Sequence, residues 1–133
     1  PEHSKLIRYL GDKVRVDGFK SDISPYLAAC DYYISSSKTE GLANTLLEAM
    51  SAGLPILVSD IPSHRMVVQG SPLIIGRLFD ADGFKDFEQG ISYVLKLNRR
   101  EIAENTQKEF YRKYTVQTMT KGYECQYERL LNE

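Results

Sequence analysis

Two glutamates are the side chains in this sequence best placed to do chemistry: Glu40 at the opening of a predicted helix and Glu48 in its body. Apolar residues fill the positions between them, and Gly53 is placed to end the helix before Pro55. Along a helix this separation spans about 12 Å and leaves the two side chains about 80° apart, so both can face one cleft. Paired carboxylates that act on one glycosidic bond lie only about 5–5.5 Å apart in retaining hydrolases. The spacing therefore favours contacts to two distant parts of one long ligand.

An anion site is expected between the two glutamates. The first helical turn, around Leu42 to Thr45, has free backbone N–H groups, and the helix dipole adds to their attraction for negative charge. Hydroxyl groups at both ends of a ligand with phosphates in the middle describe a nucleotide sugar. On spacing alone, a carboxylate near a helix N-terminus and a solvated helix residue remain the simpler interpretation of Glu40 and Glu48.

A resemblance to a known family supports the nucleotide-sugar interpretation. It is carried by residues 39–65, which read TEGLANTLLEAMSAGLPILVSDIPSHR. This run resembles the E-x7-E motif of the retaining GT-B glycosyltransferases, in particular glycosyltransferase family 4. The likeness extends back to VRVDGFKSDISPYLAACDYYISSS and forward to GRLFDADGF, and it is looser after residue 80. A bare E-x7-E would be a weak signal, whereas the combined pattern is specific.

The resemblance implies a role for each part of the motif. The donor sugar is assigned to the first glutamate and the backbone after it: Glu40, Gly41, Leu42 and Ala43. The diphosphate is assigned to Asn44 and Thr45, and the ribose hydroxyls to Glu48. The nucleobase pocket is assigned to Gly18 and Phe19, in the loop after an earlier strand. The resemblance implies no metal ion and no cofactor besides the donor, and it assigns no catalytic nucleophile.

The resemblance also sets the domain organisation. Residues 1–133 are expected to be a single domain, most of the C-terminal, nucleotide-sugar-binding half of a GT-B enzyme. The first strand and helix of that half, and the N-terminal acceptor-binding half against which the last helix packs, are expected outside this sequence. The parent is expected to transfer a hexose from a nucleotide diphosphate sugar to an acceptor with retention, in polysaccharide or glycoconjugate biosynthesis. The isolated chain is expected to be inactive.

Two alternatives stay open at this point. One is another GT-B enzyme, similar to a phosphorylase or an epimerase, which shares the cleft but not the transfer reaction. The other is a non-catalytic module that binds a nucleotide sugar or a partner protein. The nucleobase, the sugar and the acceptor are not specified by these residues.

The amino-acid composition limits the classes of partner that this chain is expected to bind. The 133 residues are 42% hydrophobic and 26% charged, which is ordinary for one globular domain. A net charge of −1 gives no support to nucleic acid or an anionic membrane surface as a partner. No apolar run approaches the ~18 residues of a membrane span, and no signal-peptide pattern is present. A cytoplasmic location is expected, with the parent peripheral at a membrane as an open alternative. Cys30 and Cys125 lack metal-ligand spacing and are expected to be buried free thiols.

The elements that position these residues alternate along the chain. Strands are predicted at residues 14–16, 32–36, 55–59 and 73–75. Helices are predicted at residues 22–30, across the motif, from Pro62, and at 83–97, 99–113 and 115–131. This order predicts an α/β fold, a Rossmann-like parallel sheet with helices on both faces. The G-x-G-x-x-G fingerprint is absent from the sequence, so a dinucleotide cofactor has little support.

Several weaker features have two interpretations. Asp80 and Asp82 match the D-x-D metal motif of GT-A enzymes, but capping of the helix that starts at Gly83 is favoured. His64 is either a base or hydroxyl ligand or, more commonly for such a position, a partly exposed turn residue. Met66 stands where many relatives have a glutamate, which argues against an acidic role there.

Other polar residues are expected to be structural or solvated. Ser35, Ser36, Ser37 and Lys38 precede the motif and either line the phosphate site or face solvent, with a solvated Lys38 favoured. Asp22 and Asp60 are expected to cap the helices that follow them. The late tyrosines are expected to pack with a wet hydroxyl, some of them toward the absent half of the enzyme: Tyr111, Tyr114, Tyr123 and Tyr127.

Overall fold

A parallel sheet of three strands forms the centre of the chain in a computed structural model that describes residues 11–41 and 43–132. The strands are β1 (Tyr33–Ser35), β2 (Ile56–Ser59) and β3 (Gly76–Phe79), in the spatial order β1-β2-β3. Tyr33 pairs with Ile56, and Ile56 pairs with Gly76. Because neighbouring strands are parallel, their carboxyl ends and the loops that follow them meet at one edge of the sheet.

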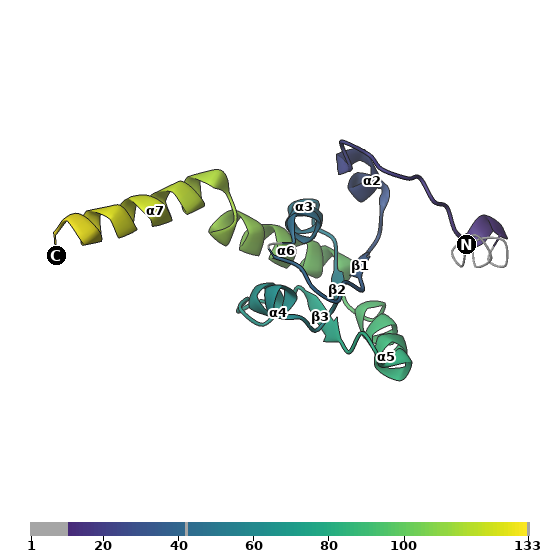
Figure 1. Cartoon of the computed structure of the whole chain (residues 1–133). Helices are drawn as coiled ribbons and strands as arrows, with labels where there is room; N and C mark the ends of the chain where they lie inside the picture. The colour runs from purple at the N-terminus through teal and green to yellow at the C-terminus, as the bar shows by residue number, and fades with distance from the viewer. Residues whose placement is uncertain (1–10, 42, 133) are drawn as a thin grey trace.

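Helices connect and surround these strands (Figure 1). They are η1 (Gly11–Lys13), α2 (Ser24–Ala29), α3 (Asn44–Ser51), α4 (Pro62–Val68), α5 (Phe84–Val94), α6 (Arg99–Lys113) and α7 (Val116–Leu131). Helix α3 crosses over between β1 and β2, and α4 crosses over between β2 and β3. Both connections are βαβ units, as the motif predicted.

The central strand shows why the sheet needs cover on both faces. All four residues of β2 are buried. Ile56 and Val58 pack with Met50 of α3 and with Val67 of α4, whereas Leu57 packs in a separate cluster with Val94 of α5. Successive side chains of a strand point to opposite faces, so the two clusters lie on opposite sides of the sheet. The predicted α/β fold with helices on both faces is confirmed.

The motif helix ends as its sequence predicts. Gly53 has a φ of +77°, a left-handed conformation that glycine adopts without strain. Its N–H bonds the carbonyl of Met50 at 3.0 Å, and the N–H of Leu54 bonds the carbonyl of Ala49 at 3.1 Å. These bonds satisfy the last carbonyls of α3 and turn the chain into β2.

Two predicted strands are corrected. The strand predicted at residues 73–75 is displaced to β3, because Ser71 bonds both the N–H and the carbonyl of Leu73 and holds that segment in a turn. Residues 14–16 form no strand, and Val16 is 65% exposed. A strand needs a neighbour for its backbone groups, and no described segment pairs with this one.

The predicted burial of the two cysteines is wrong as well, although both are free as predicted. Cys30 and Cys125 are free and exposed. Cys30 lies just after the short α2, and Cys125 lies on α7, where no residue is buried. Figure 1 shows α7 projecting away from the sheet, so its periodic apolar residues cover nothing in the described part of the chain. Helical periodicity predicted the helix correctly but not its burial.

The late tyrosines divide in the same way. Tyr114 is partly buried and packs against the core cluster that contains Ile56. Burial raises the pKa of the Tyr114 hydroxyl, and the nearby Glu109 carboxylate raises it further. Tyr123 and Tyr127 are exposed on α7, and Tyr111 is exposed on α6. Of these four late tyrosines, only Tyr114 therefore packs against the core.

Candidate functional site

Two loops meet at the carboxyl edge of the sheet and form the floor of the candidate site. The first runs from β1 to α3 and carries Glu40, and the second turns from β2 into α4. Ser59, the last residue of β2, is buried and donates its hydroxyl to the carbonyl of Ser37 at 2.5 Å. Ser37 also bonds the hydroxyl of Ser35 at 3.1 Å. The loop that carries Glu40 is thus attached to the core strand of the sheet.

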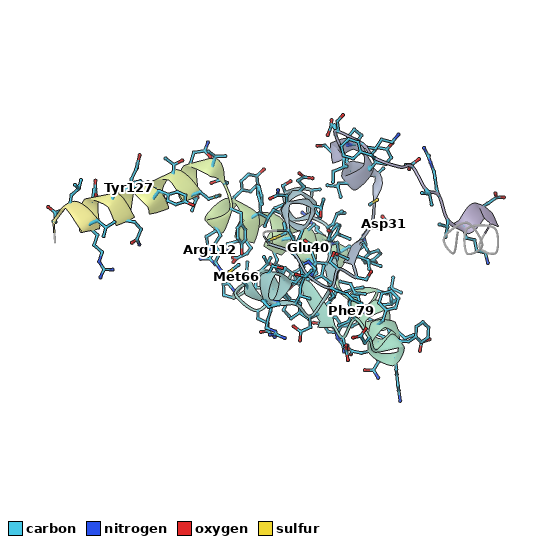
Figure 2. The ribbon with its side chains drawn as sticks, viewed as in Figure 1. Asp31, Glu40, Met66, Phe79, Arg112 and Tyr127 are labelled. Carbon is cyan, nitrogen blue, oxygen red and sulfur yellow. The ribbon has the colours of Figure 1, made fainter. Side chains whose placement is uncertain are left out.

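His64 joins the same two loops. Its side chain is 0% exposed, with Nε2 at 3.8 Å from Oε2 of Glu40. On the other side of the ring, Nδ1 lies 2.9 Å from the backbone carbonyl of Ser59. The prediction of a partly exposed turn residue is therefore wrong: His64 lies in the buried first turn of α4, and Glu40 of the loop lies beside its ring. Figure 2 shows Glu40 in the middle of the molecule, whereas Tyr127 lies far out on α7.

The start of α3 is open. Its N-cap residue is Ala43, and no described side chain accepts a hydrogen bond there. The first helical bonds run from the N–H groups of Leu46 and Leu47 to the carbonyl of Ala43, so the amides before Leu46 have no acceptor within the helix. Unsatisfied N–H groups at the positive end of the helix dipole attract anions. The geometry expected of an anion site is present, although Leu42, which was assigned to the donor sugar, lies outside the described residues.

Glu40 does not open this helix. It lies in the loop, four positions before Asn44, the first residue of α3. The backbone of Ala43, with φ −75° and ψ 84°, is not helical, so the helical angle between the two glutamates does not apply. Glu40 therefore lies beside His64, whereas Glu48 lies on the exposed surface of α3.

Glu48 lines a small pocket between α3 and the segment that leads into α2. The pocket has a volume of about 210 Å³ and is lined by residues of α3 and of the segment before and into α2: Lys20, Ser21, Asp22, Ile23, Ser24, Thr45 and Glu48. Asp22 accepts a hydrogen bond from the N–H of Ser24 at 2.9 Å, and this bond lowers the pKa of the Asp22 carboxyl. The predicted helix cap at Asp22 is nevertheless wrong, because the N-cap of α2 is Ile23 and it has no side-chain cap. Gly18, with a φ of +67°, and Phe19, which is 93% exposed, immediately precede the pocket lining.

Tyr33 is a site residue that sequence reasoning missed. Its hydroxyl lies 2.9 Å from Oγ1 of Thr45, so β1 supports the first turn of α3 directly. Both Tyr33 and Ser59 were missed because their bonds join segments that are distant in the sequence, 12 positions apart for Tyr33 and Thr45 and 22 for Ser59 and Ser37. A polar residue at the carboxyl end of a buried strand is the one signal that could have found Ser59.

The D-x-D sequence is engaged in other contacts. Oδ1 of Asp80 accepts the N–H of Asp82 at 3.0 Å, and Asp82 forms an exposed ion pair with Lys38 at 3.0 Å. The prediction that these aspartates cap α5 is wrong, because the N-cap of α5 is Gly83, which has no side chain to accept a helix N–H group. Asp86 in the first turn accepts the N–H of Asp80 instead. No group of three or more metal-binding side chains occurs among residues 11–41 and 43–132.

Asp60 also differs from its predicted role. The N-cap of α4 is Ile61, and no side-chain cap is present there. Asp60 pairs instead with Arg65 at 2.7 Å, and this hydrogen bond lowers the pKa of the Asp60 carboxyl. Met66 is 62% exposed on α4 and carries no charge into the site.

Comparisons of the chain with known proteins all point to glycosyltransferases. Residues 1–97 match the sequence profile described as "Glycosyl transferases group 1". The chain is 27% identical to the lipopolysaccharide core biosynthesis glycosyltransferase LpsE of Rhizobium meliloti, over 90% of this chain and 36% of that protein. It is 29% identical to the lipopolysaccharide core biosynthesis mannosyltransferase LpsB of the same organism, over 57% of this chain and 22% of that protein.

A third relative extends the likeness over nearly the whole chain. The O-antigen biosynthesis glycosyltransferase WclY of Escherichia coli is 25% identical over 95% of this chain and 34% of its own length. The chain thus spans about a third of the length of two of these curated relatives and less of the third. Within the part of the chain that the structure describes, no helix is both long and apolar enough to cross a membrane.

Proposed function

Because the chain belongs to the glycosyl transferases group 1 family, we propose that it is the donor-binding half of a retaining GT-B glycosyltransferase of family 4. The whole protein would move a hexose from a nucleotide diphosphate sugar to an acceptor with retention of configuration. One observation carries the proposal: the uncapped N-terminus of α3 opens at the carboxyl edge of the sheet, with Glu40 in the loop before it and Glu48 on the helix after it.

The sugar end of the ligand is assigned to the loop before α3. Glu40 would accept hydrogen bonds from sugar hydroxyls, and the backbone of Gly41, Leu42 and Ala43 would line the same subsite. Like-charge repulsion disfavours a direct contact between the Glu40 carboxylate and a phosphate. Sugar hydroxyls beyond the phosphate are neutral donors and suit the carboxylate better.

The diphosphate is assigned to the first turn of α3. The N–H groups of Asn44 and Thr45 precede the first helical bonds, and they are aligned with the helix dipole before any ligand arrives. Negative charge grows on the leaving diphosphate as the sugar bond breaks, and preorganised donors stabilise that charge most in the transition state. The proposal needs no metal ion for this step.

The nucleoside end is assigned to the pocket beside Glu48. The carboxylate of Glu48 would accept the ribose hydroxyls, and the pocket opens toward the segment after Gly18 and Phe19. An exposed Phe19 ring has a free face for a nucleobase. In this proposal the sugar, the diphosphate and the nucleoside follow one another from Glu40, past the first turn of α3, to Glu48.

The acceptor is proposed from the relatives alone. Their printed names place them in the biosynthesis of lipopolysaccharide core and O-antigen. A growing polysaccharide or glycolipid is therefore the acceptor class that we propose, bound largely by an N-terminal half outside these 133 residues. The chain without that half would bind nucleotide and have no transfer activity. The parent would be cytoplasmic, with a peripheral membrane contact as an open alternative.

The test is a set of calorimetric titrations of the chain with nucleoside diphosphates and their sugar conjugates. Glu48→Gln should weaken binding of the matching nucleoside diphosphate about tenfold, because a hydrogen bond to a charged group is lost. Glu88→Gln, on the exposed side of α5, is the matched control and should change nothing. Undetectable binding by the chain and by the whole protein would contradict the proposal. If the whole protein converted the nucleotide sugar when no acceptor was present, the result would favour the epimerase-like alternative.

A further inference from the structure

The buried ring of His64 is a feature that the proposed function does not use. Nδ1 lies 2.9 Å from the carbonyl oxygen of Ser59 and 3.3 Å from its hydroxyl. A carbonyl oxygen can only accept a hydrogen bond, so Nδ1 must carry a proton. This bond ties the ring to the last residue of β2 and fixes which nitrogen faces the loop before α3.

The other ring nitrogen faces a carboxylate. Nε2 of His64 is buried and has no hydrogen-bond partner among the described residues. The nearest charged group is Oε2 of Glu40, at 3.8 Å, and the Glu40 side chain is itself only 25% exposed. A buried polar atom left without a partner is destabilising, and a lone pair that faces a carboxylate adds repulsion. A proton between the two atoms removes both penalties.

We propose that His64 is the positioning residue of the donor site and that its Nε2 donates a hydrogen bond to Glu40. This inference rests on the proposed function, in which Glu40 binds the donor sugar. The bond needs a shift of about 1 Å from the present separation to reach ordinary hydrogen-bond length. His64 then bridges the backbone of Ser59 and the Glu40 carboxylate, so the sheet itself sets the direction of that carboxylate.

The bridge has a consequence for affinity. One carboxylate oxygen of Glu40 is held against the ring, and the other stays available to a sugar hydroxyl. A free glutamate side chain must lose rotamer entropy when it binds a ligand, and a carboxylate that is already held loses less. The Ser59–Ser37 bond holds the loop backbone in the same way. Together they preorganise the sugar subsite before the donor arrives.

A matched pair of substitutions separates the two nitrogens. The amide nitrogen of glutamine reaches the position of Nε2, and that of asparagine reaches the position of Nδ1. His64→Gln therefore keeps a donor for Glu40, and His64→Asn keeps only the bond to Ser59. In the whole protein that carries these residues, His64→Asn should weaken nucleotide-sugar binding about tenfold, while His64→Gln should stay within about threefold of wild type. Both should bind the free nucleoside diphosphate as wild type does.

Ser63→Ala is the control for packing. The Ser63 hydroxyl is also buried on the first turn of α4 and has no hydrogen-bond partner among the described residues. Ser63→Ala should leave both affinities unchanged. An equal loss in Ser63→Ala and His64→Asn, or equal losses in His64→Gln and His64→Asn, would assign the effect to packing of α4 and overturn the inference.

A spectroscopic measurement tests the bridge without a ligand and without changing a buried residue. A ring nitrogen that carries a proton has a ¹⁵N resonance well separated from one that does not. We expect the Nε2 resonance of His64 in wild type to be that of a ring nitrogen that donates a hydrogen bond, and to change in Glu40→Gln, where the carboxylate acceptor is removed. An unprotonated Nε2 in wild type would overturn the inference. A protonated Nε2 combined with unchanged sugar-nucleotide affinity in Glu40→Gln would keep the bridge and contradict the proposed role of Glu40 instead.

Discussion

The surroundings of Glu40 and of Glu48, the two ends of the proposed donor site, are built differently. On the Glu40 side, the loop is attached to the sheet by the buried Ser59 hydroxyl and faces the buried ring of His64. On the Glu48 side, an exposed carboxylate on α3 faces a pocket of about 210 Å³ whose other wall is an exposed segment. Under the proposed function, the sugar subsite would be held by the sheet before the donor arrives, and the nucleoside subsite would be the more exposed of the two. Substitutions at the two ends should therefore change different properties.

The largest effect is expected at the Glu40 end. Glu40→Ala should lower transfer by the whole protein about 100-fold, because a charged acceptor of the sugar is lost from a preorganised position. Affinity for the free nucleoside diphosphate should stay the same or rise slightly, since a negative charge near the phosphates is removed. Steady-state transfer assays measure the first effect. Transfer rates within threefold of wild type would show that the Glu40 end does not hold the sugar.

A second prediction tests the attachment of the loop. Ser59→Ala removes the bond to the Ser37 carbonyl and should lower the free energy of unfolding by about 1–2 kcal/mol. It should also weaken nucleotide-sugar binding more than nucleoside diphosphate binding, since the loop with Glu40 is released. Denaturant unfolding and the two titrations measure this. A stability loss with equal effects on both ligands would mean that the attachment serves only the fold.

A smaller effect is expected at the Glu48 end. Phe19→Ala should weaken nucleoside diphosphate binding about threefold, because base–aromatic contacts are modest when the ring is exposed in the free protein. Stability should not change, since the ring is 93% exposed. Calorimetry with diphosphates of different bases measures it. No change for any base would remove Phe19 from the site.

The smallest expected effect is that of metal removal. Chelation should leave transfer unchanged, because α3 and its dipole supply the charge stabilisation in this account. Asp82→Asn, which breaks the exposed pair with Lys38, should also leave transfer unchanged, since exposed pairs contribute little. Strict dependence on Mg²⁺ or Mn²⁺ that is lost in Asp82→Asn would restore the D-x-D interpretation.

The sequence predicted what local patterns determine. The apolar run of β2 and Gly53 at the end of α3 are short-range signals, and the structure confirms both. The alternation of strands and helices is confirmed from β1 to β3, except that residues 14–16 form no strand and β3 is displaced from residues 73–75. The fold class and the position of Glu48 on the motif helix follow from these signals. The roles of the motif residues came from resemblance and stay predictions.

The sequence did not predict what depends on contacts between distant segments. His64 is buried with Glu40 of a distant loop beside its ring, and no periodicity in α4 signals that contact. Asp82 pairs with Lys38, which is 44 positions away, instead of capping α5. The exposure of Cys125 depends on where α7 lies relative to the sheet. Such contacts depend on how distant elements are arranged, and local patterns in the sequence do not show that arrangement.

The central claim is a division of labour between the two glutamates, and one paired titration tests it most directly. Glu40→Ala and Glu48→Gln would each be titrated with a nucleoside diphosphate and with its intact sugar conjugate, in the whole protein. We expect Glu40→Ala to lose affinity only for the sugar conjugate, and Glu48→Gln to lose about tenfold in affinity for both ligands. Equal losses for both ligands in Glu40→Ala would contradict this division of labour.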